Sequence, residues 1–150
     1  MVGPNVSANT LTSAVGAGDR QAGLRVLVVD DDEAIREMLT QLLSDEGYDT
    51  FDAENGVHAL SVASSTHPDV IVLDMGLPVL DASGFVRAWK EREGALQVPV
   101  VAISGQPFGE TMAREIGAVV FYEKPLDVTQ FVASVRDLAT RQAQRRPRSG

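Results

Sequence analysis

The chain is 150 residues long, and 44% of its residues are hydrophobic and 23% are charged. These values are typical of one globular domain and exclude a fibrous repeat or a largely disordered chain. The absence of cysteine excludes disulfides and thiolate metal sites and suits a reducing cytoplasm. No segment approaches the roughly 20 consecutive apolar residues that cross a bilayer. We therefore expect a cytoplasmic protein with no membrane partner.

The net charge of −8 is unevenly distributed along the chain. Four arginines lie within the last ten residues, and without them nine basic residues face 21 acidic ones, a net charge of −12 for residues 1–140. Such an acidic domain repels nucleic acid and favours a divalent cation or a basic partner. The arginines have no aromatic residues between them, so we interpret them as a solvated end: Arg141, Arg145, Arg146 and Arg148.

The order of residue types divides the chain into three parts. Residues 1–23 are rich in Gly, Ser, Thr, Asn and Ala without a sustained apolar period, which predicts a flexible N-terminal arm. From residue 24 to residue 140, short apolar runs alternate with segments of helical period. This alternation predicts a single α/β domain, a parallel sheet with helices on both faces. Residues 141–150 form the basic tail.

The first two strand and helix pairs are predicted as follows. Residues 25–29 form a strand, and the helix after it starts with acids and ends at Gly47. Residues 49–53 form a weaker strand, followed by a helix that starts near Asn55 and ends at His67 before a proline. The first helix carries its apolar residues at helical spacing: Ile35, Leu39, Leu42 and Leu43.

Three more pairs complete the predicted domain. Residues 70–73 are apolar throughout, so this strand is predicted to be buried on both faces at the centre of the sheet. The remaining predicted strands span residues 98–103 and 118–122, with a short helix at about 110–116 between them. The helix after the central strand buries Phe85, Val86 and Trp89, and the last helix is capped by Asp127 and buries Phe131, Val132, Val135 and Leu138.

Polar residues stand at the ends of four of these strands. They are Asp30, Asp31 and Asp32 after the first strand, then Asp74, Ser104 and Lys124. The carboxyl ends of parallel strands share one edge of the sheet, so these side chains should meet there. Asp32 also suits a helix start, and we assign it that structural role.

The convergence of carboxylates predicts a divalent cation. Clustered carboxylates repel one another, and a hard cation such as Mg²⁺, or Mn²⁺, relieves the repulsion. Mg²⁺ keeps coordination positions for water and phosphate, so the same cluster can receive a phosphoryl group. A lysine and a hydroxyl nearby can neutralise and hydrogen-bond the phosphoryl oxygens.

Four motifs carry a family resemblance. They are Val-Val-Asp-Asp at 28–31, Leu-Asp at 73–74, Ala-Ile-Ser at 102–104, and Phe-Tyr-Glu-Lys-Pro at 121–125. In this order and approximate spacing they resemble the motif set of response regulator receiver domains, from about residue 24 to residue 140. The resemblance implies a five-stranded, doubly wound, flavodoxin-like sheet with strand order 2-1-3-4-5.

The resemblance also implies roles for the residues of the strand ends. Asp74 would accept a phosphoryl group from a histidine kinase or a histidine phosphotransfer protein. Asp30 and Asp31 would hold Mg²⁺ together with Asp74 and the backbone carbonyl of Gly76. Lys124 would contact the incoming phosphoryl oxygen.

The implied switch involves two further residues. The Ser104 hydroxyl would move toward the phosphate, and Phe121 would turn inward into the vacated space. The output would be a changed protein-binding face over the fourth helix, fifth strand and fifth helix, read by a downstream protein. The resemblance also implies a cis Lys124-Pro125 bond.

Such a protein would catalyse only its own phosphorylation and dephosphorylation. Neither tail has room for an output domain, so we expect a stand-alone receiver of a two-component system or phosphorelay, as a monomer or weak homodimer.

The sequence departs from the family pattern at two places. The glycine commonly found four residues after the proline of the third loop is Ala82 here, and Gly84 follows two residues later. This predicts a lengthened and reshaped loop after Pro78. The interval from Ser104 to Phe121 is about two residues shorter than usual, which predicts a trimmed or irregular fourth helix and puts the usual dimer face in doubt.

Two other functions compete with this interpretation. Asp30-Asp31-Asp32 contains the D-x-D of haloacid-dehalogenase-like phosphatases, in which Asp30 would be the nucleophile and Ser104 and Lys124 would match further motifs. However, three consecutive aspartates produce this pattern automatically, and Asp74 would have no role. The other candidate is a receiver that binds partners without phosphate, and the complete set of polar residues argues against it. No glycine-rich nucleotide-binding motif follows a strand.

Overall fold

The computed structural model describes residues 23–77, 81–93 and 98–145. Within these ranges, five parallel strands form one sheet in the order β2-β1-β3-β4-β5, which confirms the predicted fold. The strands are β1 (Arg25–Val29), β2 (Asp49–Ala53), β3 (Val70–Asp74), β4 (Val100–Ser104) and β5 (Val120–Glu123). The described helices are α3 (Glu33–Asp45), α4 (Gly56–Thr66), α5 (Ala82–Glu93), α6 (Gly109–Glu115) and α7 (Val128–Arg145).

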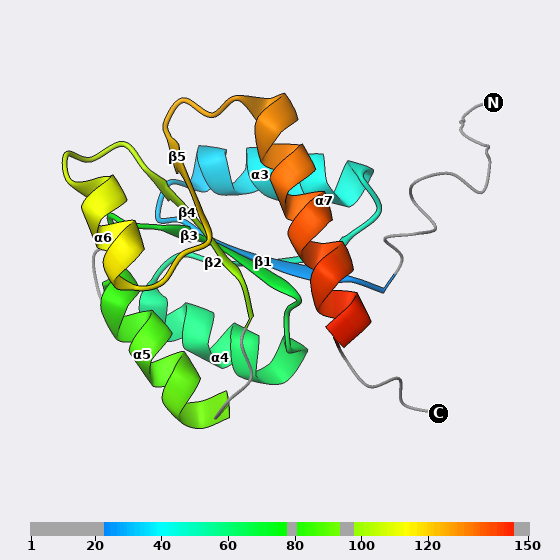
Figure 1. Cartoon of the computed structure of the whole chain (residues 1–150), viewed down its shortest axis with the longest axis horizontal. Coiled ribbons are helices and arrows are strands. Elements are labelled where there is room, and N and C mark those ends of the chain that lie inside the picture. The colour runs from blue at the N-terminus through cyan, green and yellow to red at the C-terminus, as the bar shows by residue number, and fades with distance from the viewer. Residues whose placement is uncertain (1–22, 78–80, 94–97, 146–150) are drawn as a thin grey trace.

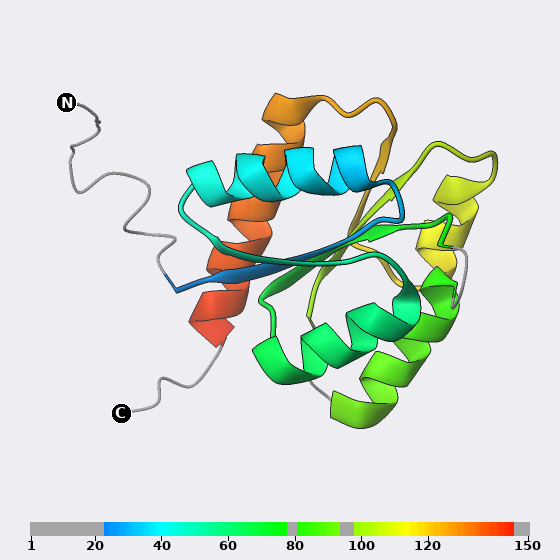
Figure 2. The ribbon, with the colours of Figure 1, turned by 180° about the vertical axis from the view of Figure 1, so that it is seen from behind.

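The helices form a layer on each face of the sheet (Figures 1 and 2). Successive residues of a strand point to opposite faces, so each central strand contributes to both layers. Leu27, Val29, Ile71 and Leu73 lie in a cluster with α4, α5 and α6. Val26, Val28, Val70 and Val72 lie in a second cluster with α3 and α7. All five residues of β3 are buried, as predicted for the central strand.

Local chemistry explains where the first helices begin and end. The side chain of Asp32 accepts hydrogen bonds from the backbone N–H groups of Ala34 and Ile35, so Asp32 is the N-cap of α3, as predicted. Asn55 caps α4 in the same way. His67 ends α4 with a φ of 51°, and Gly47 follows α3 with a φ of 102°. Both are left-handed conformations, which commonly close helices.

Several predicted boundaries differ from those observed, and three of them by two residues or more. β4 begins at Val100 and not at residue 98. β5 begins at Val120 and not at residue 118, because Gly117 turns with a φ of 80° and the N–H of Ala118 bonds back to the carbonyl of Ala113 in α6. α7 continues to Arg145, five residues beyond the predicted end of the domain.

α6 has only seven residues, and its N-cap, Phe108, provides no side-chain hydrogen bond, in agreement with the predicted short fourth helix. The Lys124-Pro125 bond is cis, as the resemblance implies.

Other predictions fall on residues that the structure does not describe. The predicted loop change after Pro78 falls on residues 78–80, while Ala82 opens α5 and is fully buried. Residues 1–22 of the predicted arm and residues 146–150 of the predicted basic tail also lie outside the described residues.

One aromatic pair joins β5 to α7. The rings of Tyr122 and Phe131 meet edge to face, with centroids 6.1 Å apart. The Tyr122 hydroxyl also donates to the carbonyl of Gln130 and shares a hydrogen bond with Ser134. The first half of α7 is therefore fixed to the last strand by both apolar and polar contacts.

No helix in the described ranges is long and apolar enough to cross a bilayer. This is consistent with the composition of the sequence.

Phe131 offers a test of the α7 interface. Replacing this fully buried ring by alanine should lower the free energy of unfolding by about 3–5 kcal/mol, because it removes apolar contacts and leaves a cavity. Urea denaturation measures the change. Val128→Ala on the same helix, where the side chain is 41% exposed, should change stability by less than about 0.5 kcal/mol. Equal effects of the two substitutions would contradict the observed packing.

Candidate functional site

The carboxyl edge of the sheet gathers the residues predicted from the strand ends. Asp74 closes β3 and Ser104 closes β4, while Asp30 follows β1 and Lys124 follows β5. Backbone hydrogen bonds continue the ladder beyond the strands, from Met75 N–H to the Ile103 carbonyl and from Lys124 N–H to the Ser104 carbonyl, each 2.9 Å long. The polar side chains therefore project from fixed backbone positions.

Three carboxylates meet at this edge. Asp30, Asp31 and Asp74 each have a carboxylate oxygen within 4.8 Å of those of the other two. Asp30 is fully buried and Asp74 is 4% exposed, whereas Asp31 is exposed. Backbone donors orient the two buried carboxylates: Asp32 N–H bonds to Asp30 Oδ1 at 2.9 Å, and Gly76 N–H bonds to Asp74 Oδ1 at 3.1 Å.

Lys124 is the cation within the cluster. Its Nζ lies 2.9 Å from Asp30 Oδ2 and 3.6 Å from Asp74 Oδ2. One ammonium group thus contacts two carboxylates in a largely buried site, where attraction between charges is stronger than in water. It offsets only part of the negative charge of three aspartates.

The electrostatic environment changes the acidity of Asp74. Burial raises the pKa of Asp74 from an ordinary 3.8 to about 6, and the charge of Asp30 adds to the increase. The Gly76 hydrogen bond and the Lys124 charge act in the opposite direction but do not cancel it. Asp74 is therefore a carboxylate whose negative charge is incompletely stabilised.

The pKa of Lys124 shifts in the direction expected for an ion pair. Burial by itself lowers the pKa of Lys124, but the hydrogen bond to Asp30 and the charges of Asp74, Asp30 and Asp31 outweigh it. The net result is a pKa above the ordinary value of 10.5. Lys124 therefore stays charged at any physiological pH.

These residues fit a hard divalent cation. Three carboxylates with oxygens this close supply the donor type that Mg²⁺ takes in proteins. Burial and then the charge of Asp30 raise the pKa of Asp74, and a bound cation would favour its ionised form. Gly76 lies two residues beyond Asp74 and its backbone already approaches the Asp74 carboxylate.

Ser104 lies at the same edge, but its hydroxyl has a different partner. Ser104 is buried, and its Oγ accepts a 2.9 Å hydrogen bond from the backbone N–H of Gln106. No hydrogen bond connects this hydroxyl to Asp74 or Lys124 within the described ranges. The structure thus brings Asp30, Asp31, Asp74 and Lys124 into contact and leaves Ser104 bonded to the loop that follows it.

Gly109 brings the start of α6 against Ser104. A Cβ at Gly109 would lie 2.5 Å from both Cβ and Oγ of Ser104 and 3.4 Å from the ring of Phe121. Only glycine fits such a close approach without displacement of its neighbours. Ser104, Gly109 and the half-buried Phe121 therefore touch in one small region beneath the β4–α6 loop.

Arg36 is a site residue that the sequence analysis missed. Its NH1 donates to the backbone carbonyl of Asp30 at 2.9 Å, and its Nε forms a 2.8 Å ion pair with Asp52. The side chain is only 15% exposed. An arginine on a predicted helix usually faces solvent, so its position in the sequence gave no signal of this contact. Arg36 secures the backbone at the end of β1 that carries Asp30.

Comparison with known sequences identifies the family. The model of the response regulator receiver domain matches residues 26–136. The sporulation initiation phosphotransferase F of Bacillus subtilis is 30% identical over 112 residues, which cover 75% of this chain and 90% of that protein. The response regulator MprA of Mycobacterium avium is 34% identical over 118 residues, 79% of this chain. The match covers 52% of MprA, so the chain spans about half the length of that relative.

Solved structures agree with the sequence comparison. The chemotaxis protein CheY4 of Vibrio cholerae superposes with a TM-score of 0.69 at 27% identity, covering 77% of this chain and 98% of CheY4. The family model matches most of the chain, and the strand order is the one expected from the resemblance. The aspartate, serine and lysine motifs of the family also lie at one edge of the sheet. The chain belongs to the response regulator receiver domain family.

Proposed function

We propose that Asp74 is the phosphoryl acceptor of this receiver domain and takes its phosphoryl group from a histidine kinase or a histidine phosphotransfer protein. The observation that carries the proposal is the position of Asp74: a buried carboxylate at the end of the central strand, 3.6 Å from the Lys124 ammonium. Burial raises the pKa of Asp74 to about 6, which makes its carboxylate a better nucleophile than an ordinary aspartate.

The chemistry is phosphoryl transfer to a carboxylate. An oxygen of Asp74 forms a bond to phosphorus while the bond from phosphorus to the donor's leaving group breaks, which produces an acyl phosphate on Asp74. The new phosphoryl oxygens need positive charge and hydrogen-bond donors. Lys124 supplies an ammonium within reach of Asp74, and the backbone N–H of Gly76 already faces that carboxylate.

Asp30, Asp31, Asp74 and the Gly76 backbone carbonyl form the proposed binding site for Mg²⁺, or Mn²⁺. When bound, the ion neutralises the carboxylates and the charge that develops on the transferred group. The aspartate cluster supports this assignment, because three carboxylates share the charge of a single lysine.

Ser104 and Phe121 are the proposed switch residues. Ser104 Oγ accepts the backbone N–H of Gln106, the second residue of the loop before α6, so a movement of the hydroxyl toward the phosphate would also act on this loop. The contact of Ser104 and Phe121 with Gly109 links both residues to the start of α6. The proposed output is a population shift of the face made by α6, β5 and α7, which a downstream protein reads.

The relatives support a role in signalling. Receiver domains are signalling modules and not general enzymes, and one relative carries the name of a phosphotransferase. We infer that this domain catalyses only its own phosphorylation and dephosphorylation. It serves a two-component system or a phosphorelay from the cytoplasm.

A phosphatase that uses Asp30 as nucleophile is not favoured. Asp30 is fully buried, its Oδ2 contacts Lys124 and its Oδ1 accepts the Asp32 N–H. Asp30 is thus more buried and more closely paired with Lys124, at 2.9 Å, than Asp74 is at 3.6 Å, so it is the less suitable nucleophile. The Asp32 side chain, which would be the acid in that mechanism, is occupied as the cap of α3.

The first experiment is chemical phosphorylation. Incubation with Mg²⁺ and acetyl phosphate should give one Mg²⁺-dependent phosphoryl group on Asp74, located by trapping and mass spectrometry. Asp74→Asn should abolish the label because the amide is not a nucleophile. Asp49→Asn, a change of the same type at an exposed residue on β2, should leave it unchanged. A label on Asp30 with release of phosphate would instead support the phosphatase, and no label would favour a phosphate-independent receiver.

The raised pKa of Asp74 predicts a pH-dependent stability. Because the pKa is about 6 in the folded protein and 3.8 ordinarily, the folded state binds more protons between these values, and stability falls as the pH rises through them. The loss reaches about 3 kcal/mol at pH 7. Asp74→Asn should therefore raise the free energy of unfolding by up to about 3 kcal/mol at pH 7.5 without Mg²⁺, and by about half as much at pH 5.

Urea denaturation at the two pH values measures this effect. Asp49→Asn is the control and should change stability little at either pH. A gain for Asp74→Asn that is the same at pH 5 and pH 7.5 would contradict the electrostatic account. Added Mg²⁺ should stabilise the wild-type protein more than the Asp74→Asn variant.

Arg36 should affect the metal site without contacting it. Arg36→Ala removes the donor to the Asp30 carbonyl, so Mg²⁺ affinity should fall about tenfold, as for other residues that orient ligands. Isothermal titration calorimetry measures the affinity. Arg87→Ala, at an exposed position on α5, is the matched control. Unchanged Mg²⁺ affinity in Arg36→Ala would show that the arginine only ties α3 to β2.

A further inference from the structure

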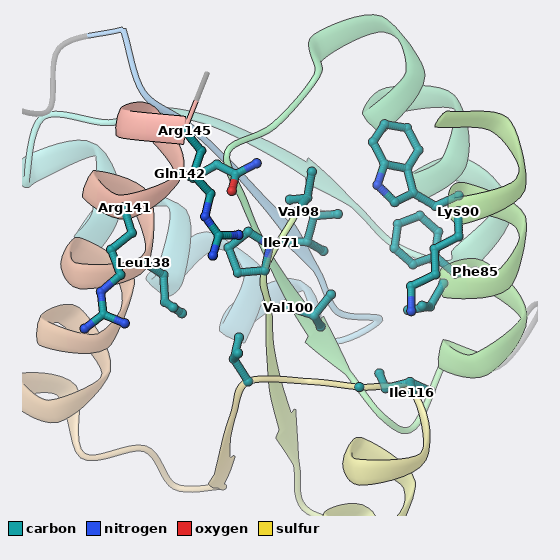
Figure 3. Close-up of a pocket in the computed structure, with 15 residues that line it drawn as sticks. Ile71, Phe85, Lys90, Val98, Val100, Ile116, Leu138, Arg141, Gln142 and Arg145 are labelled. Carbon is teal, nitrogen blue, oxygen red and sulfur yellow. The ribbon is translucent and has the colours of Figure 1, made fainter. Parts of the chain in front are cut away.

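A pocket lies at the edge of the sheet opposite to Asp74. It is formed where α5 and α7 end, over the starts of β3 and β4, and it has a volume of about 310 Å³. In Figure 3, Phe85 and Lys90 of α5 lie on one side, and Gln142 and Arg145 of α7 lie on the other. Ile71 and Val100 lie between them. This volume is at the lower end of the range of small-molecule sites, about 300–1,000 Å³.

The pocket combines an apolar interior with positive charge. Its apolar lining includes Ile71, Phe85, Val86, Val98, Val100 and Leu138. Three lining residues are cationic, Lys90, Arg141 and Arg145, and no lining residue is acidic. The chain as a whole has a net charge of −8, so a pocket lined by three cations and no acid is unusually positive for this protein. Such an arrangement suits a ligand with an apolar body and an anionic group.

The charges of the pocket are largely unpaired. Arg141 forms an exposed ion pair with Asp137, with an N···O distance of 3.3 Å. Lys90 and Arg145 have no ion-pair partner among the residues that the structure describes. Figure 3 shows Lys90 and Arg145 on opposite sides of the pocket, so a positive charge stands on each side of its apolar interior.

One uncharged donor in the pocket wall lacks an acceptor. The indole N–H of Trp89 is excluded from solvent and has no hydrogen-bond partner in the described structure. Buried donors without acceptors are uncommon, because their desolvation is then uncompensated. A ligand oxygen that reached the indole would provide the missing acceptor.

We propose that this pocket binds a small amphipathic carboxylate, a molecule with an aliphatic or aromatic body of modest size. The apolar body lies against Ile71, Val100 and Leu138. The carboxylate lies toward Lys90 and Arg145. The site is separate from the phosphorylation chemistry, so it gives the domain a second input at its opposite edge.

Trp89 makes the proposal directly measurable, because it is the only tryptophan in the chain and it lines the pocket. The probe is octanoate, titrated below the concentration at which it forms micelles while Trp89 emission is recorded. Octanol, which has a chain of the same length but no charge, is the control. We expect saturable binding of octanoate with at least tenfold higher affinity than octanol. Because the pocket is distant from Asp74, the Asp74→Asn variant should bind octanoate equally well, so this result does not depend on the proposed phosphorylation.

Two double variants, each of which removes two positive charges, test whether Lys90 and Arg145 contribute to octanoate affinity. Lys90→Gln with Arg145→Gln should reduce octanoate affinity at least tenfold and leave octanol binding unchanged. Arg87→Gln with Arg114→Gln removes the same charge outside the pocket and should reduce octanoate affinity less than twofold. All four positions are exposed, so thermal denaturation should show that both variants fold. Three results would overturn the proposal: a change in Trp89 emission that does not saturate with octanoate, equal affinities for octanoate and octanol, or an equal loss of octanoate affinity in the two double variants.

Discussion

A single lysine ammonium joins two buried carboxylates at the edge of the sheet. Asp30 and Asp74 come from neighbouring strands and are both buried, so their charges repel in a medium that screens poorly. Lys124 follows β5, two strands from β3 and three from β1, and its Nζ offsets this repulsion at 2.9 Å from Asp30 and 3.6 Å from Asp74. These contacts require β5 to pair with β4 and β4 with β3, which is the observed topology. Three aspartates carry more negative charge than one lysine neutralises, and such a cluster suits a cation.

The two helical layers keep this arrangement fixed. Each central strand sends alternate residues into separate apolar clusters, so neither layer can be lost without exposing half of the strand side chains. In β1 and β3, the strands that lead to Asp30 and end in Asp74, every residue after Arg25 is buried. β5 at the border of the sheet is only half-buried, and α6 beside it has only seven residues. The site is therefore anchored by the centre of the sheet, while its Lys124 side lies at a less buried border.

The sequence analysis predicted the parallel sheet and the converging polar residues from apolar runs, turn residues and the strand ends, whereas the strand order came only from the resemblance to receiver domains. β1 and β2 were predicted to the residue, since charged or turn residues border them. The starts of β4 and β5 were placed two residues early, because apolar residues before each strand belong to turns. Arg36 and Gly109 were missed, because the contacts of each form only when distant segments fold together.

Strand β5 has a mechanical consequence for the whole domain. Phe121 packs with the cluster beneath α6, while its neighbour Tyr122 lies on the other side of the sheet and holds α7 through its ring and hydroxyl. A single peptide unit therefore connects the two halves of the hydrophobic interior. A small displacement of this strand would therefore move one side chain in each apolar cluster. Through these two adjacent residues, β5 couples the packing of α6 on one face of the sheet to that of α7 on the other.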